Sequence, residues 1–220
     1  NLPLIHDKNT IIKKADSFAL VGKDKYEFTS IVDALSGIGS RKTIVIMDAV
    51  HTESGIIIDK DIAIIGYGQA ETVIRGAESA SQSPNRIIEI MEGSTVFLYN
   101  LTISNGRPAE MLRRGGGILS FGDLEIVNCT IRDNEALYGA GIFTNSKLLI
   151  RDSTISGNRT FRAPSAETIT GRGCTGSGGG IKTEKGADVE IYGSLITDNS
   201  TFRKGGGIFA ACETNVYLEN

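Results

Sequence analysis

The stretch GGGILSFGDLEIVNCTIRDN (115–134) contains every part of a phrase that recurs along the chain. It begins with a block of small residues ending in Ile, continues with an alternating pattern, bends at an Asn and ends with a second alternating pattern. The small-residue blocks are GGGI (115–118), GAGI (139–142), GGGI (178–181) and GGGI (205–208). The segments after them are LEIVNCTI (124–131), LLIRDSTI (148–155), VEIYGSLI (189–196) and VYLEN (216–220), and an earlier copy without glycines reads VFLYNLTI (96–103).

The spacing of this phrase predicts a solenoid. The Ile residues that end the blocks are 24, 39 and 27 residues apart, which indicates a coil of about 24 residues with loops inserted into some coils. Such a coil is too short for a helical crossover between parallel strands. Its apolar runs are short, rich in Ile, Val and Thr, and end at Gly, Asn or Asp, so they predict strands.

Stacking the coils in register aligns columns of similar residues. Alternate residues of a strand point to opposite faces, so every second position lies in the core. The inward columns on either side of the bend read Leu98, Ile126, Ile150, Ile191 and Leu218, then Ile103, Ile131, Ile155 and Ile196. The bend column reads Asn100, Asn128, Asp152, Gly193 and Asn220, which are residue types that tolerate a left-handed backbone. These columns predict an aliphatic core and a ladder of identical turns.

The phrase GGGI...L.I.N.TI..N resembles the glycine-rich repeats of bacterial surface proteins and polymorphic outer-membrane proteins, within the pectin-lyase-like superfamily. Two earlier stretches are similar to that superfamily as well. TSIVDALSGI (29–38) resembles its capping helix, and KTIVIMDAVHTESGIIIDKDIAIIGYGQAETVIRG (42–76) resembles its first coils. The resemblance implies an all-β fold, a right-handed parallel β-helix with a short N-terminal capping helix.

The chain is expected to form a single elongated domain. Residues 1–28 are an N-terminal segment, 29–41 are the capping helix and entry, and 42–220 are the β-helix, with loop insertions at 106–114 and 159–177. With 220 residues, 40% of them hydrophobic and no Trp, the chain suits a narrow aliphatic core. The net charge of -3 gives no general attraction to nucleic acid, and no apolar run reaches the ~18 residues of a membrane helix.

Three cysteines allow at most one disulfide. Cys129 falls at an inward position after the bend and is predicted to be a buried thiol. Cys174 lies in the long insertion and Cys212 follows the last glycine block, so these two are the candidate disulfide pair. No metal site or cofactor is predicted, because His6 and His51 have no ligand-like neighbour at a useful spacing.

The sequence gives little sign of catalysis. Hydrolases of the resembling superfamily carry NTD, DD, GHG and RIK motifs, and none occurs here. Its lyases work on the face of the first strand with carboxylates that bind calcium and a basic residue. The corresponding outward residues, Leu119, Phe143, Lys182 and Phe209, include no carboxylate in four coils. The acids near the front, Asp48, Glu53, Asp59 and Asp61, are interpreted as solvated turn residues.

The variable loops precede the glycine blocks and should emerge along one edge of the stack. Their basic residues are Arg107, Arg113, Arg114, Arg159, Arg162, Arg172, Arg203 and Lys204, against Glu110 and Glu167. Insertions on one side of a solenoid often mark its binding face, and guanidinium groups pair with carboxylate or sulfate in forked geometry. This edge is therefore a candidate site for an anionic glycan or an acidic partner surface, with ordinary solvated loop charge as the alternative.

Two further features concern sugars. Tyr192 and Tyr217 are outward residues of neighbouring coils, so their rings are a candidate sugar platform, although outward aromatic residues also simply favour strands. Of the four N-x-T sequons, Asn158 and Asn199 lie at the starts of loops and are expected to be the accessible glycosylation sites.

These observations predict a secreted or cell-surface β-helix with a structural, adhesive or filament-forming role and no catalysis. Its candidate partners are an acidic polysaccharide, a host or cell-surface partner, and a second copy stacked end to end, since exposed strand edges recruit partners. The alternative is a polysaccharide lyase or other carbohydrate-active enzyme acting on an acidic polysaccharide.

Overall fold

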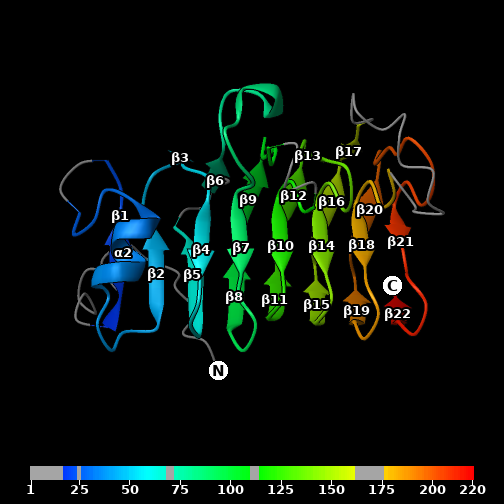
Figure 1. The fold of residues 1–220 in the computed structure, drawn as a ribbon. Helices are drawn as coiled ribbons and strands as arrows, with labels where there is room; N and C mark the ends of the chain where they lie inside the picture. The colour runs from blue at the N-terminus through cyan, green and yellow to red at the C-terminus, as the bar shows by residue number, and fades with distance from the viewer. Residues whose placement is uncertain (1–16, 24–25, 68–71, 110–113, 162–175) are drawn as a thin grey trace.

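The computed structural model describes residues 17–23, 26–67, 72–109, 114–161 and 176–220. Strands of successive coils lie side by side along the long axis, with one short helix at the N-terminal end (Figure 1). Every pairing between neighbouring coils is parallel. The predicted all-β parallel β-helix is therefore confirmed. The described residues include no helix long and apolar enough to cross a membrane.

Three sheets run along the axis. Six coils contribute one strand to each sheet, and the second sheet has one further strand at each end. The first sheet contains β4 (Ile56–Ile58), β7 (Ile88–Ile90), β10 (Ile118–Ser120), β14 (Ile142–Thr144), β18 (Ile181–Thr183) and β21 (Ile208–Phe209). The second contains β1 (Ala19–Val21), β2 (Thr43–Ile46), β5 (Ile62–Gly66), β8 (Thr95–Tyr99), β11 (Asp123–Val127), β15 (Lys147–Arg151), β19 (Asp188–Tyr192) and β22 (Asn215–Glu219). The third contains β3 (Val50–Thr52), β6 (Thr72–Arg75), β9 (Leu101–Ser104), β12 (Thr130–Arg132), β16 (Thr154–Ser156) and β20 (Leu195–Thr197).

The connections between the sheets define two edges that are used below. The turn edge consists of the residues that join a first-sheet strand to a second-sheet strand. The loop edge consists of the residues that join a third-sheet strand to the next first-sheet strand, and it includes the glycine blocks. On the loop edge, β13 (Glu135–Ala136) pairs with β17 (Arg159–Thr160), and the short 3-10 helix η2 is Ala80–Gln82.

The core is the predicted stack of aliphatic columns. Ile126 pairs with Leu98 on one side and with Ile150 on the other, and all three side chains are fully buried. The second inward column continues in the same way from Ile103 to Ile155. Leu218 keeps the register but is exposed, because β22 is the last strand of its sheet.

The bend between the second and third sheets is a single residue in the left-handed conformation. Asn100, Asn128, Asp152 and Gly193 all have φ between 47° and 56°, so the predicted ladder of identical turns is confirmed in these four coils. The amide nitrogen of Asn128 donates to Oδ1 of Asn100 at 3.0 Å. Cys129, one residue further, is buried as predicted, and burial raises the pKa of its thiol to about 12.

A second ladder lies inside the loop edge and consists of Asn134, Asn158 and Asn199. Oδ1 of Asn158 accepts from the backbone N–H and the amide of Asn134, at 3.1 and 3.0 Å. Its own amide donates to the carbonyl of Ile131 at 2.8 Å and to Oδ1 of Asn199 at 2.9 Å. The last Asn of the repeated phrase is thus a buried connector that satisfies backbone groups where one strand ends and a loop begins.

The glycine blocks pack directly against this ladder. A Cβ on Gly141 would lie 2.6 Å from the carbonyl oxygen of Gly180 and 3.0 Å from the amide nitrogen of Asn158. Gly117 and Gly180 are equally crowded by the next block and the next Asn. Glycine is therefore required here by the close approach of two backbones rather than by a ligand.

The N-terminal end is closed by α2 (Ile31–Gly37), whose buried side chains join the core cluster. The hydroxyl of Ser30 accepts from the N–H of Asp33 at 3.0 Å and caps the helix. The predicted capping helix within 29–41 is therefore present. β1 pairs with β2, so the second sheet begins before the boundary at residue 42 that the sequence suggested.

The glycine–asparagine contact predicts that Gly141→Ala destabilises the fold by about 2–3 kcal/mol, because the added methyl group overlaps a backbone carbonyl that has no room to move. The matched control is Gly207→Ala in the last block, where the nearest atom to the new Cβ is Cγ2 of Ile196 at 3.3 Å. The control is expected to change the unfolding free energy by less than about 0.5 kcal/mol. Urea unfolding followed by circular dichroism measures both, and equal losses would contradict the explanation.

Candidate functional site

The outward face of the first sheet carries one side chain per coil. The register aligns Ile57, Glu89, Leu119, Phe143, Lys182 and Phe209 in one column. The four coils with glycine blocks contribute no carboxylate to this column, as the sequence indicated. Glu89 stands in the same column in the preceding coil. That coil has no glycine block, so aligning the glycine blocks of the sequence did not include it.

Cationic side chains lie over the aromatic rings of this face. The ammonium of Lys182 is 4.2 Å from the ring centroid of Tyr138, and it lies within 6 Å of the Phe143 and Phe209 rings. The guanidinium of Arg114 is 4.9 Å from the Phe143 ring. These cation–π contacts explain why Lys182 is only 8% exposed although it points outward.

Arg86 is a second buried cation at this face. It lies two residues before Ile88, as Gly116 lies two residues before Ile118, so it occupies a glycine-block position in an earlier coil. One guanidinium nitrogen pairs with Glu89 at 3.1 Å, while Nε and the other terminal nitrogen are buried without a hydrogen-bond partner. Burial lowers the pKa of Arg86, and Glu89 partly offsets this. Two buried donors without acceptors are unusual in a folded protein.

The predicted basic residues of the loop edge are only partly brought together. Isolated parallel β-bridges of the backbone align Arg114 with Tyr138, Tyr138 with Ser177 and Ser177 with Lys204 in successive coils. Another such β-bridge aligns Arg159 with Ser200. Arg203 is exposed beside Lys204. Three further members of the predicted set lie outside the described residues, namely Arg113, Arg162 and Arg172.

Carboxylates from other coils neutralise part of this edge. Glu135 pairs with both Arg107, at 3.3 Å, and Arg159. Glu184 pairs with Arg114 at 3.5 Å. The sequence interpretation set only Glu110 and Glu167 against the basic residues and left out Glu135, which lies in one of the variable loops, and Glu184, which lies outside them. The net positive charge of the loop edge is therefore smaller than the sequence suggested.

The candidate sugar platform lies on the second sheet. The Tyr192 and Tyr217 ring centroids are 5.7 Å apart, and Tyr217 is 52% exposed. Each hydroxyl donates to a carboxylate two residues away in its strand, Glu190 at 2.9 Å and Glu219 at 2.8 Å. These hydrogen bonds raise the pKa of both tyrosines. The two rings are thus neighbours on one face, as expected.

The predicted accessibility of the two sequons is wrong for Asn158. Its side chain is fully buried, and its amide nitrogen, the atom that would carry a glycan, donates two hydrogen bonds in the asparagine ladder. Asn199 is half-buried, and its amide donates to the carbonyl of Ile155 at 2.7 Å. The N-x-T pattern arises because the fold requires the asparagine of the ladder and a Thr of the loop happens to follow it two residues later.

The cysteine pair is only half described. Cys212 is exposed, whereas Cys174 lies outside the described residues, so the disulfide stays a prediction. The described residues contain no group of three or more His, Cys, Asp or Glu arranged to hold a metal ion.

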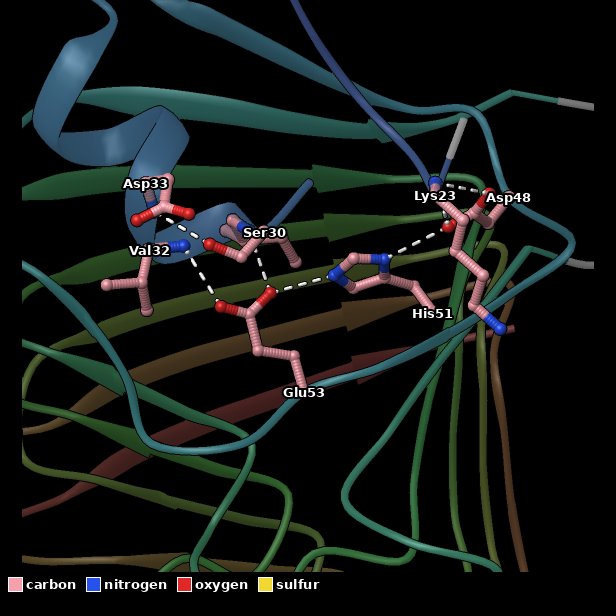
Figure 2. Close-up of polar contacts among 8 residues, drawn as sticks. Lys23, Ser30, Val32, Asp33, Asp48, His51 and Glu53 are labelled. Carbon is pink, nitrogen blue, oxygen red and sulfur yellow. Dashed lines mark hydrogen bonds and ion pairs between the residues drawn. The ribbon is translucent and has the colours of Figure 1, made fainter. Parts of the chain in front are cut away.

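His51 sits in a polar network at the N-terminal end of the core (Figure 2). Its register partner is Ile74, so it occupies the first place of an aliphatic column. Its ring nitrogens contact Glu53 at 2.8 Å and Asp48 at 3.3 Å. Glu53 also accepts from the N–H groups of Ile31 and Val32, at 2.7 and 3.0 Å.

This network corrects the interpretation of the front acids. Asp48 and Glu53 are mostly buried, whereas Asp59 is solvated as expected. Glu53 holds the capping helix to β3, and Asp48 joins His51 to the backbone N–H of Lys23. Burial opposes the charged forms, but the hydrogen bonds outweigh it, so the pKa of His51 is raised above 6.5 and the pKa of Glu53 is lowered below 4.5. The only histidine among the described residues is therefore engaged in holding the cap.

Comparison with protein families supports the fold. The family described as Right handed beta helix region matches residues 7–220. The solved structure of a pectin methylesterase from Aspergillus niger is similar at 13% sequence identity and a TM-score of 0.40, covering 93% of this chain and 85% of that chain. No match was found among curated proteins.

The buried network predicts a stability that depends on pH. The contribution of protonated His51 is complete below pH 6.5 and is lost as the pH rises through its raised pKa, while that of ionised Glu53 is complete above pH 4.5 and is lost as the pH falls through its lowered pKa. We expect His51→Gln to cost about 2 kcal/mol between these pH values and less at pH 9. Urea unfolding across this range measures it, and a loss independent of pH would contradict the ion pair.

Proposed function

Because the chain belongs to the family of right-handed β-helix regions, we propose that it is a non-catalytic, secreted or cell-surface β-helix module that binds an acidic polysaccharide along its loop edge. The β-helix supplies a rigid support, and the loops supply the contacts. This is the function that the arrangement of charge supports best.

One observation carries the proposal. In a chain of net charge -3, the loop edge and the adjoining first-sheet face gather many of the described cations. The cations are Arg86, Arg107, Arg114, Arg159, Lys182, Arg203 and Lys204, and the described carboxylates of the same region are Glu53, Glu78, Glu89, Asp133, Glu135 and Asp198. The surplus lies in the coils from residue 105 onward, where six of these cations stand against Asp133, Glu135 and Asp198, and where Glu184 of the turn edge pairs with Arg114. The surplus favours an acidic ligand, because complementary charge steers and holds it.

The unsatisfied donors of Arg86 support the same ligand chemistry. An unpaired buried donor costs about 1–3 kcal/mol, and a charged one costs more. A carboxylate or sulfate oxygen that reached Nε and the free terminal nitrogen would remove this cost in forked geometry. A neutral sugar offers weaker acceptors at the same position.

The structural part of the proposal is end-to-end self-association. β20, β21 and β22 each have a partner strand on one side only, and Leu195 and Leu218 are exposed there. A coil of a second copy that paired in parallel with these strands would cover the exposed side chains. Light scattering of the full-length native chain is expected to show assemblies that grow with concentration, and monomers at all concentrations would contradict this.

A second candidate function is a polysaccharide lyase, favoured by the presence of Glu89 and Lys182 on one sheet face. Eliminative cleavage needs a base that removes the proton next to a uronate carboxyl group. The ammonium of Lys182, however, lies over the Tyr138 ring, a contact that stabilises the charged form, which is not a base. An assay for unsaturated uronate products, with and without calcium, is expected to give none. Product formation that disappears in Lys182→Ala would replace the binding proposal.

The binding proposal predicts that the triple variant Arg114→Gln, Arg203→Gln, Lys204→Gln weakens binding to polygalacturonate about tenfold or more, a loss of ~1.4 kcal/mol. The matched control removes the same charge elsewhere, through Arg132→Gln, Lys147→Gln and Lys185→Gln. Titration calorimetry at fixed salt measures both. Equal effects of the two triple variants would show that only net charge matters, and unchanged binding in the first would exclude the loop edge.

A further inference from the structure

The turn edge has connections of unequal length. Two consecutive coils turn in two residues, 121–122 between β10 and β11 and 145–146 between β14 and β15. The coils on either side of this pair turn in four residues, 91–94 and 184–187. Since neighbouring coils lie about 4.8 Å apart, the two short turns form a recessed floor about 10 Å wide.

A hollow of about 450 Å³ lies over this floor and against the 91–94 turn. The volume falls within the range of about 300–1,000 Å³ that is typical of small-molecule sites. The residues that line it and matter for recognition are Met91, Glu92, Phe121, Asp123, Asn145 and Ser146. None of these belongs to the loop edge.

The hollow is built from backbone that has little freedom. A Cβ on Gly122 would lie 2.4 Å from the carbonyl oxygen of Ser94 and 2.6 Å from that of Met91, so the short turn touches the wall directly. The N–H of Asp123 donates to the Ser94 carbonyl at 2.9 Å, and that of Phe121 donates to the Ile90 carbonyl at 2.9 Å. A preformed site of this kind loses little conformational entropy when a ligand binds.

The chemistry of the lining differs from that of the loop edge. Phe121 supplies a half-buried ring, and Met91 beside it is 39% exposed. Asp123 accepts from the Ser146 hydroxyl at 2.7 Å through one oxygen, which leaves its other oxygen and the Glu92 carboxylate as acceptors. Among the residues that the structure describes, none that lines the hollow is basic.

From this combination we infer that the hollow binds a neutral saccharide. A pyranose presents an apolar face of C–H groups, which suits the Phe121 ring, and hydroxyl donors, which suit the carboxylates of Glu92 and Asp123 and the amide of Asn145. An acidic sugar is disfavoured, because its carboxylate would face two others without a cation between them. The hollow therefore takes a different class of glycan from the loop edge.

The test uses hexasaccharides of β-1,4-linked glucose, mannose and galactose as probes, with calorimetry on the full chain. We expect at least one to bind, and we expect Glu92→Gln and Phe121→Ala each to weaken it at least tenfold. The matched controls are Asp59→Asn, an exposed carboxylate of the same edge outside the hollow, and Phe202→Ala, an exposed ring of the loop edge. Both controls are expected to bind like the native chain.

Several outcomes would overturn the inference. One is the absence of binding by all three hexasaccharides at millimolar concentration, and another is undiminished binding by Glu92→Gln when that variant is folded. A third is displacement of the sugar by spermidine, or binding that weakens steeply with salt, because both would show that the carboxylates serve a cation. None of these outcomes affects the acidic-glycan proposal, which concerns the loop edge. The triple variant Arg114→Gln, Arg203→Gln, Lys204→Gln is expected to bind neutral hexasaccharides like the native chain.

Discussion

The side-chain amide of each asparagine of the ladder lies against a residue of a glycine block, 2.9 to 3.1 Å from where a Cβ on that residue would stand. Asn158 against Gly141 is the central example, with Asn134 and Asn199 in the neighbouring coils. Each ladder asparagine precedes a loop, and a glycine block follows that loop. Where both take part in such contacts, both ends of the loop are held in place. Loops of very different length can therefore be inserted between the same two points without disturbing the register. The longest one, between Asn158 and Gly178, stretches that coil to 39 residues between block isoleucines and leaves β14 and β18 paired residue for residue.

The repeat of about 24 residues explains why the fold could be predicted from the sequence. A residue that recurs once per coil meets its own copy in the next coil, so the aliphatic columns and the left-handed bend residues are local patterns with a direct spatial meaning. The asparagine ladder follows this rule too, since it stands three residues after the inward Ile of the third sheet. Its meaning was missed because N-x-T is also a glycosylation pattern, and the pattern does not reveal that Asn158 faces the core.

Some residues of the candidate site could not be placed in this way, because their partners do not recur. Glu184 pairs with Arg114 of a distant coil, and this pairing does not follow from spacing. Glu135 stands 24 residues before Arg159 and is its register partner, so that pairing does follow from the repeat and was overlooked. The N-terminal end departs from the repeat for another reason. His51 takes a core position where its neighbour is the capping helix rather than another coil, so a polar side chain is tolerated there only with Glu53 and Asp48 as partners. The sequence shows these acids but not that Glu53 accepts from the N-terminus of the capping helix or that Asp48 accepts from the backbone of Lys23.

The two edges of the β-helix differ in charge, and the distance between them is short. A first-sheet strand of three residues spans about 10 Å, so this distance separates the loop edge from the turn edge within one coil. Between them, the side chain of Arg114 reaches from the loop edge over Phe143 to Glu184, at the start of a turn. An acidic polymer laid across this face would meet Glu92 and Asp123 at its far end, and they would repel it. The favourable course for such a polymer is along the axis of the β-helix on the loop edge. Arg107, Arg114, Arg159, Arg203 and Lys204 follow one another there, and only the 133–141 connection between them lacks a basic residue.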